Sequence, residues 1–182
     1  YMRYGGAVVS TTIDKFFYVF LTVNADETIQ ITSSDYRTFY RHDPDEPMLF
    51  DGDLSLPRAI LNHFGLTRGF AMFLASEVPP GTGLGSSSTV AVAIIKAVAT
   101  ARGRMLTKPQ IAELACQIEI EKLGEPIGKQ DQYATAFGDL NFYEFTSQGV
   151  KVEPVRASPE TRRTLEKNLL LFFTGSTRAA MC

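Results

Sequence analysis

The segment VPPGTGLGSSSTVAVAIIKA, residues 78–97, constrains the fold of this chain more than any other. Gly81, Gly83 and Gly85 alternate in it, directly before three serines and a run of small apolar residues. A glycine costs about 0.5–1 kcal/mol in ordered structure, so three of them indicate that something approaches the backbone closely. The ordinary alternative is a turn followed by a capped helix.

The residues after the glycines predict a helix that begins at Ser86 or Ser87. Apolar residues recur there at helical spacing and form one stripe. The free N–H groups and the positive dipole end of such a helix would face the glycine turn, which is an anion site with phosphate as its usual ligand. The stripe consists of Val90, Ile94, Ala97, Val98 and Ala101.

Two familiar phosphate loops do not fit this spacing. The P-loop requires a lysine after its last glycine, and none follows here. The dinucleotide fingerprint G-x-G-x-x-G is one residue longer than the G-x-G-x-G of this chain.

The segment instead resembles the P-x-G-x-G-L-G-S-S-A motif of the GHMP small-molecule kinases, with Ser88 at the alanine position. The resemblance implies an α+β fold, the GHMP kinase N-terminal domain (ribosomal protein S5 domain 2-like), with a mixed β-sheet packed against helices. It also implies that ATP binds to Pro80, Gly81, Gly83, Leu84, Gly85, Ser86, Ser87 and Ser88.

The rest of the chain predicts interleaved strands and helices. Thr107 and Gln110 form a capping box before one helix, which Gly124 ends. We expect residues 41–53, which are acidic and turn-rich, to be a solvated loop. Strands are predicted at residues 7–23 (one or two), 28–34, 70–79, 140–145, 150–155 and 169–173, and helices at 56–64 and from about 158.

Composition bounds the classes of function. The chain has 182 residues, 45% of them hydrophobic, and a net charge of −2, so we expect no nucleic-acid partner. No apolar run reaches about 18 residues, and two cysteines make no disulfide framework, so we expect a cytoplasmic enzyme without a membrane partner. Residues 1–182 are expected to be a nucleotide-binding domain truncated at both ends, with a C-terminal domain that begins at or beyond about residue 170.

Phosphoryl transfer also needs a cation and a group that orients the acceptor hydroxyl. The candidates lie in IEIEKLGEPIGKQDQ, residues 118–132. Glu119 and Glu121 flank the predicted helix stripe at similar angles, so periodicity does not choose between them, and a solvated helix edge explains either. Asp131 fits a helix N-cap as well as a rigidly held base.

The resemblance assigns roles to these residues. Galactokinase-like members of the family place a magnesium-binding glutamate twelve residues before the catalytic aspartate, across a G-x-P-x-G-x-x-D-Q turn, and Glu119 and Asp131 match this spacing. Ser87 would be the second Mg²⁺ ligand. Lys129 would keep Asp131 ionised or contact substrate phosphate, and Gln132 and Tyr133 are predicted to contact the sugar.

A further substrate contact is predicted where the strand at residues 169–173 ends. Thr174, Gly175 and Arg178 would emerge there, and an arginine fork suits a phosphate group. An ordinary solvated arginine explains Arg178 equally well.

The run GKQDQYATAFGDLNF, residues 128–142, is similar to the branch of the family that phosphorylates heptose 7-phosphates. The resemblance implies a kinase that transfers phosphate from ATP to the anomeric hydroxyl of a sugar phosphate. The alternatives are another sugar kinase of the family, such as a fucokinase or galactokinase relative, and a non-catalytic sugar or nucleotide sensor. A sensor would not need Asp131 together with Glu119.

Overall fold

A computed structural model describes residues 5–172 and divides them into two compact units, which are described separately. One unit comprises residues 14–137 and the other residues 5–13 and 138–172. The strands are β1 (Gly6–Thr11), β2 (Phe17–Val23), β3 (Ile29–Ser33), β4 (Thr38–His42), β5 (Phe70–Ser76), β6 (Leu140–Thr146) and β7 (Gly149–Pro154). The helices are α1 (Ser55–His63), α2 (Ser86–Ala101), α3 (Lys108–Cys116), the π-helix η1 (Gln117–Lys122), α4 (Gln130–Phe137) and α5 (Pro159–Asn168).

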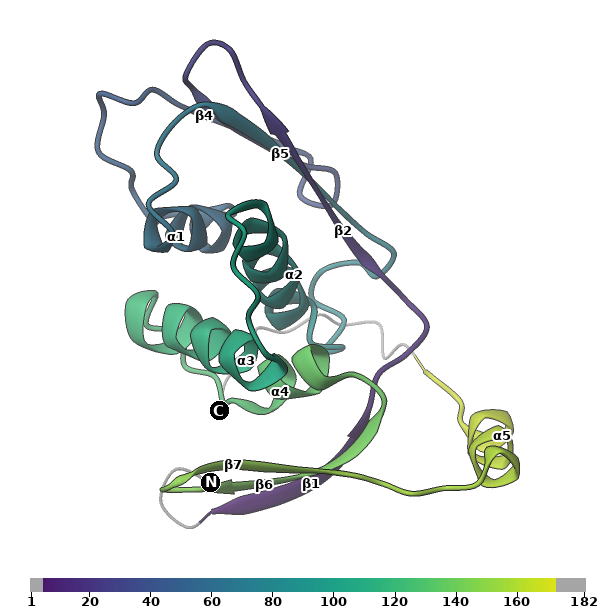
Figure 1. Ribbon diagram of the computed structural model, residues 1–182. Coiled ribbons are helices and arrows are strands. Elements are labelled where there is room, and N and C mark those ends of the chain that lie inside the picture. The colour runs from purple at the N-terminus through teal and green to yellow at the C-terminus, as the bar shows by residue number, and fades with distance from the viewer. Residues whose placement is uncertain (1–4, 173–182) are drawn as a thin grey trace. The chain divides into compact units, whose positions relative to one another are not determined.

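The unit of residues 14–137 is built on a mixed sheet with the strand order β2-β5-β3-β4 (Figure 1). β5 pairs antiparallel with β2 and parallel with β3, and β3 pairs antiparallel with β4. Side chains alternate along β3, so that Ile29 and Ile31 are buried while Gln30 is not. This alternation gives the sheet an apolar face, against which α1 and α2 pack.

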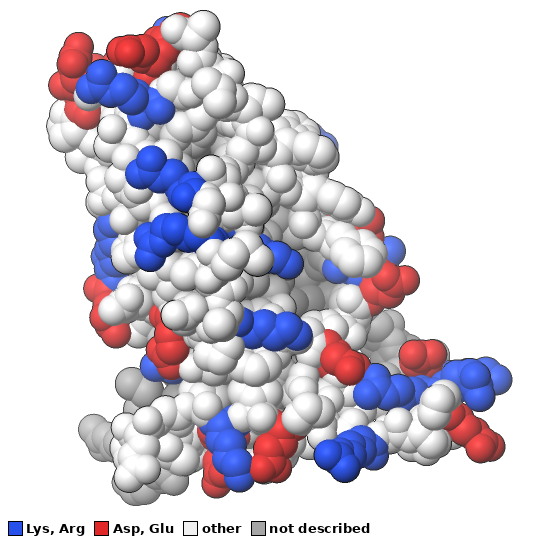
Figure 2. All heavy atoms as spheres, in the orientation of Figure 1, with Lys and Arg blue, Asp and Glu red and all other residues white. Residues whose placement is uncertain are grey.

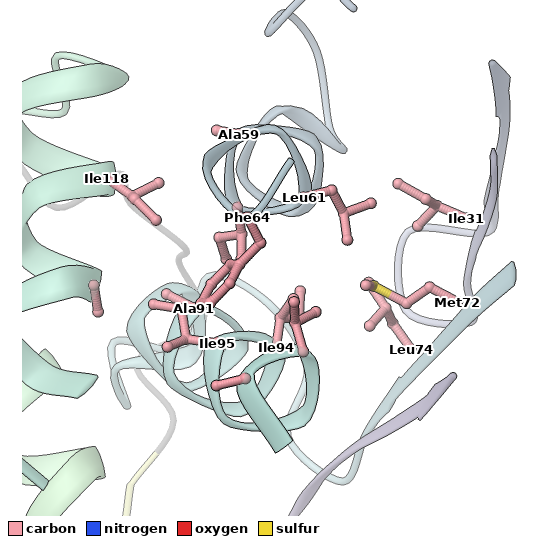
Figure 3. Packing of buried hydrophobic residues seen from close by; sticks show 14 of the residues in the cluster. Ile31, Ala59, Leu61, Phe64, Met72, Leu74, Ala91, Ile94, Ile95 and Ile118 are labelled. Atoms are coloured by element: carbon pink, nitrogen blue, oxygen red, sulfur yellow. The ribbon is translucent and has the colours of Figure 1, made fainter. Parts of the chain in front are cut away.

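The core of this unit lies between that sheet face and the helices (Figure 3). Met72 from β5 and Ile94 from α2 are almost fully buried there, and Ile118 of η1 closes the far side. The buried face of α2 is wider than the predicted stripe, because Ala91 and Ile95 are also buried, whereas Ala101 at the helix end is exposed. The core thus fixes α2, and with it the loop that precedes the helix.

The other unit contains the antiparallel sheet β1-β6-β7 and α5. β6 and β7 form the predicted strand pair, in which Thr146 pairs with Gly149 beside the turn. Ser158 caps α5 as its side chain accepts a hydrogen bond of 3.1 Å from the backbone N–H of Thr161.

Two predictions of secondary structure differ from the structure, the loop at 41–53 only in its first two residues and the strand at 169–173 over its described residues. Residues 38–42 form β4, so the predicted loop at 41–53 begins within a strand, which the β-formers Thr38, Phe39 and Tyr40 favour. The predicted buried strand from residue 169 is not formed by residues 169–172, whose side chains are 59–79% exposed. The physical reason is that a strand needs a hydrogen-bonding neighbour, and none of the described strands pairs with this segment.

The surface carries charges of both signs, interspersed over the face that Figure 2 shows. Among the helices that the structure describes, none is long and apolar enough to cross a membrane.

Candidate functional site

The glycine segment forms the loop between β5 and α2 in a conformation that glycine alone adopts readily. Gly81, Gly83 and Gly85 have φ angles of 75°, 75° and 70°, in the left-handed region. Gly85 occupies the N-cap of α2, and no side chain of the described residues caps the helix. The predicted helix start at Ser86 is confirmed, and the N–H groups of the first turn of α2 have no side-chain cap among the described residues, which is the arrangement that an anion site at a helix N-terminus requires.

Glu119 lies at the centre of a hydrogen-bonded cluster beside this loop. Its Oε1 accepts a hydrogen bond of 2.7 Å from Ser87 Oγ, and its Oε2 accepts one of 2.8 Å from Gln132 Nε2. The side chains of Glu119 and Gln132 are 1% and 0% exposed. Burial raises the pKa of Glu119, and the hydrogen bonds from Ser87, Gln132 and Ser88 oppose that rise in part. The two predicted Mg²⁺ ligands, Ser87 and Glu119, are therefore in direct contact.

The π-helix η1 buries Glu119 and leaves Glu121 exposed, a difference that periodicity did not predict. Leu123 N–H donates to Ile118 O, an i→i+5 bond that widens the turn. A wider turn rotates successive side chains by a smaller angle, so Glu119 follows Ile118 onto the buried side while Glu121 is exposed. Sequence periodicity assumes an α-helix and does not show this change.

Asp131 is the second residue of α4 and lies inside the helix, so it is not the N-cap residue. Its side chain lies against the glycine loop: a Cβ added to Gly85 would lie 3.4 Å from Asp131 Oδ2. Thr89 and Thr135, whose hydroxyls are 3.4 Å apart, join α2 to α4 nearby. Asp131 is an exposed residue, but the protein atoms around its carboxylate exclude part of the solvent and raise its pKa.

Lys129 and Tyr133 both contact Glu113 of α3. Lys129 Nζ lies 3.0 Å from Glu113 Oε2, and the hydroxyl of Tyr133 donates to Glu113 Oε1 at 2.5 Å. Burial of Glu113 acts to raise its pKa, but these two donors outweigh burial and the pKa is lowered. The pKa of Asp131 is raised by burial, and the roles predicted for Lys129 stay predictions.

A pocket of about 180 Å³ opens beside Ser87 and Glu119. Its apolar wall includes Phe17 and Tyr36, and Asp35, Asp53 and Glu125 supply carboxylates. Sequence reasoning missed this pocket, because its lining comes from segments far apart in the chain: β2, the turn after β3, the start of α1, β5, α2, and η1 with the residues that follow it. Only the folded chain brings these segments together.

The Ser87–Glu119 pair fits one class of metal ion. A hydroxyl and a single carboxylate suit Mg²⁺, which completes its shell with phosphate oxygens and waters. The described residues contain no group of three His, Cys, Asp or Glu side chains able to hold a metal ion without such help. Thr174, Gly175 and Arg178, which were predicted to contact substrate, lie outside the residues that the structure describes.

Residues 55–139 match the model of the GHMP kinases N terminal domain. This match spans α1, the glycine loop, Glu119 and Asp131. The resemblance found in the sequence is confirmed: the chain carries a GHMP kinase N-terminal domain, and its α+β fold is the predicted one.

The chain is 36% identical to the D-glycero-alpha-D-manno-heptose 7-phosphate kinase of Campylobacter jejuni, over 98% of this chain and 54% of that protein. A solved structure of a D-glycero-D-manno-heptose 1-phosphate kinase from Bacteroides thetaiotaomicron superposes with a TM-score of 0.77 at 31% identity, covering 85% of this chain and 53% of that one. The mevalonate kinase of Methanococcus jannaschii, at 20% identity and a TM-score of 0.70 over 86% of this chain and 51% of that one, shares the fold. The chain thus spans about half the length of these relatives.

Proposed function

We propose that residues 1–182 are the nucleotide-binding N-terminal domain of an ATP- and Mg²⁺-dependent sugar-phosphate kinase. The acceptor that we propose is the anomeric hydroxyl of D-glycero-D-manno-heptose 7-phosphate, and the reaction takes place in the cytoplasm. The similarity to the heptose 7-phosphate kinase of Campylobacter jejuni, at 36% identity, supports this substrate class.

One observation carries the proposal: a loop suited to phosphate, a hydroxyl–carboxylate pair and a second carboxylate meet within one unit. Ser87 Oγ is 2.7 Å from Glu119 Oε1, and the Asp131 side chain lies against Gly85. Phosphoryl transfer depends on positioning and charge stabilisation, which these groups are suited to supply.

Each group of the candidate site has a separate role in the proposed reaction. The N–H groups at the start of α2 would bind the nucleotide phosphates, and Ser87 and Glu119 would hold Mg²⁺. When bound, Mg²⁺ neutralises charge on the phosphates. Asp131 accepts the proton of the sugar hydroxyl. Its raised pKa favours this role, because a general base is most effective when its pKa lies close to the working pH.

The pocket beside Ser87 is the proposed site of the nucleoside. It adjoins the proposed phosphate site, its volume is about 180 Å³, and Tyr36 and Phe17 offer aromatic surface to a flat base. A nucleotide bound with its base in the pocket would have its phosphates beside the start of α2.

The test is a substrate screen with ATP and Mg²⁺. We expect the protein to phosphorylate heptose 7-phosphate faster than galactose, fucose or mevalonate, and ³¹P NMR of the product to show a new phosphate at the anomeric carbon. Faster turnover of an unphosphorylated sugar would contradict the proposed substrate. Tight binding of sugar and nucleotide without turnover would support a sensor instead of a kinase.

A further inference from the structure

The two oxygens of the Glu119 carboxylate face different surroundings. Oε1 accepts from Ser87, and both residues line the pocket. Oε2 accepts from Gln132 Nε2 at 2.8 Å, and the Gln132 side chain is 0% exposed. One oxygen is therefore on the side of the proposed phosphate site, and the other is held in the protein interior.

The hydrogen bond to Glu119 leaves the other polar atom of the Gln132 amide without a partner in the part of the chain that the structure describes. Only its NH₂ group can donate to a carboxylate, so the amide has to turn its Oε1 away from Glu119. That Oε1 is buried and has no hydrogen-bond partner in residues 5–172. An unpaired buried acceptor costs about 1–3 kcal/mol, and an apolar side chain of similar size would avoid that cost. An apolar side chain would, however, lack the donor for the hydrogen bond to Glu119, which the amide supplies.

We propose that Gln132 is a positioning residue that keeps Glu119 a one-oxygen ligand and thereby favours Mg²⁺ over Ca²⁺. The inference rests on the proposed function, because it takes Glu119 as a metal ligand. Mg²⁺ is small, prefers octahedral geometry and is satisfied by one oxygen of a carboxylate. Ca²⁺ is larger and often takes both oxygens of a carboxylate. With Oε2 held by Gln132, Glu119 cannot bind a metal through both oxygens, a mode that Ca²⁺ often uses and Mg²⁺ does not need.

The experiment compares metal selectivity in binding and needs no turnover. The β,γ-imido analogue of ATP is titrated into the protein by calorimetry, once with excess Mg²⁺ and once with excess Ca²⁺. Gln132→Met keeps the length of the side chain and removes its donor. Loss of a group that orients a metal ligand typically weakens metal binding by about 10- to 100-fold. We expect a loss of about tenfold or more with Mg²⁺, a smaller loss with Ca²⁺, and so a shift in selectivity towards Ca²⁺.

A purely structural role for Gln132 would weaken binding equally with both metals, and that result, or no change in either, overturns the inference. Asn141→Leu is the matched control, since it removes another buried amide, one that belongs to the other unit and bonds to Gly138 O. If Gln132→Met does not fold, Gln132→Asn, one methylene shorter, makes the same prediction. If Glu119→Gln leaves binding with Mg²⁺ unchanged, the metal role in the proposed function fails, which is a different result.

Discussion

Adding one methyl group at Gly85 should separate the role of the glycine loop in catalysis from its role in folding. Gly85 has a φ of 70°, and an added Cβ would meet the Asp131 carboxylate at 3.4 Å. Gly103, just after α2, has a φ of 68° and nothing within 4 Å of an added Cβ. The two alanine variants therefore introduce the same backbone strain, and only Gly85→Ala brings a new group against the proposed base.

The expected loss of stability is similar for both variants. A left-handed conformation costs a non-glycine residue about 1–2 kcal/mol. For a chain of this size, each kcal/mol lowers the melting temperature by about 2–4 °C, so each variant should melt about 2–8 °C below the wild type. Displacement of a reacting group by about 1 Å can cost about 10²-fold in rate. An added Cβ 3.4 Å from the Asp131 carboxylate stands at the edge of ordinary van der Waals contact, so the shift is smaller and turnover of Gly85→Ala should fall by about tenfold.

The assay is calorimetric melting together with ADP release at saturating ATP and sugar phosphate. Gly103→Ala should keep wild-type turnover, and Gly85→Ala should lose about tenfold. The reasoning is refuted if both variants melt alike and Gly85→Ala stays within threefold of Gly103→Ala in turnover.

Three further results are expected. Gly83→Val should abolish ATP binding, measured by calorimetry, and retained binding would move the phosphate site elsewhere. The far-UV spectrum should be kept, because nothing in the described structure lies within 4 Å of an added Cβ, but the φ of 75° should lower the melting temperature as it does at Gly85. The pKa of Glu119 is raised above 4.5, so the native state binds this proton more tightly than the unfolded state, and the stability of the wild type falls as the pH rises through the raised pKa. Without metal, the melting temperature of Glu119→Gln should therefore rise relative to that of the wild type as the pH increases from 4.5. A difference in melting temperature that stays constant with pH would contradict this. Burial raises the pKa of the Cys116 thiol to about 12, so this thiol should not react with a thiol reagent at about pH 8 until the protein unfolds. The measurement uses the variant Cys182→Ser, in which Cys116 is the one remaining cysteine of the sequence.

The parts of the site that local sequence determines were predictable. Alternating glycines before an apolar helical stripe have few conformations available, and both the loop and the start of α2 at Ser86 follow from them. The strand pair β6–β7 and the cap at Ser158 likewise depend on residues close in sequence.

The parts that depend on distant residues were not predictable. The burial of Glu119 depends on a π-helical turn and on a donor from α4, neither of which appears in hydrophobic periodicity. Lys129 lies two residues from Asp131 in sequence, yet its ion pair is with Glu113 on another helix. The pocket lining also comes from segments far apart in the chain.

The central claim is that Asp131 acts as the base of a phosphoryl transfer, and single-turnover kinetics of Asp131→Asn test it most directly. Asparagine keeps the size of the side chain next to Gly85 and removes the basic oxygen. General-base catalysis contributes about 10²–10⁴ in rate, so transfer from ATP to heptose 7-phosphate should slow by about 10²-fold or more while ATP affinity changes little. A variant that keeps more than about a tenth of the wild-type rate would contradict the account, because a loss of that size is below the range of general-base catalysis.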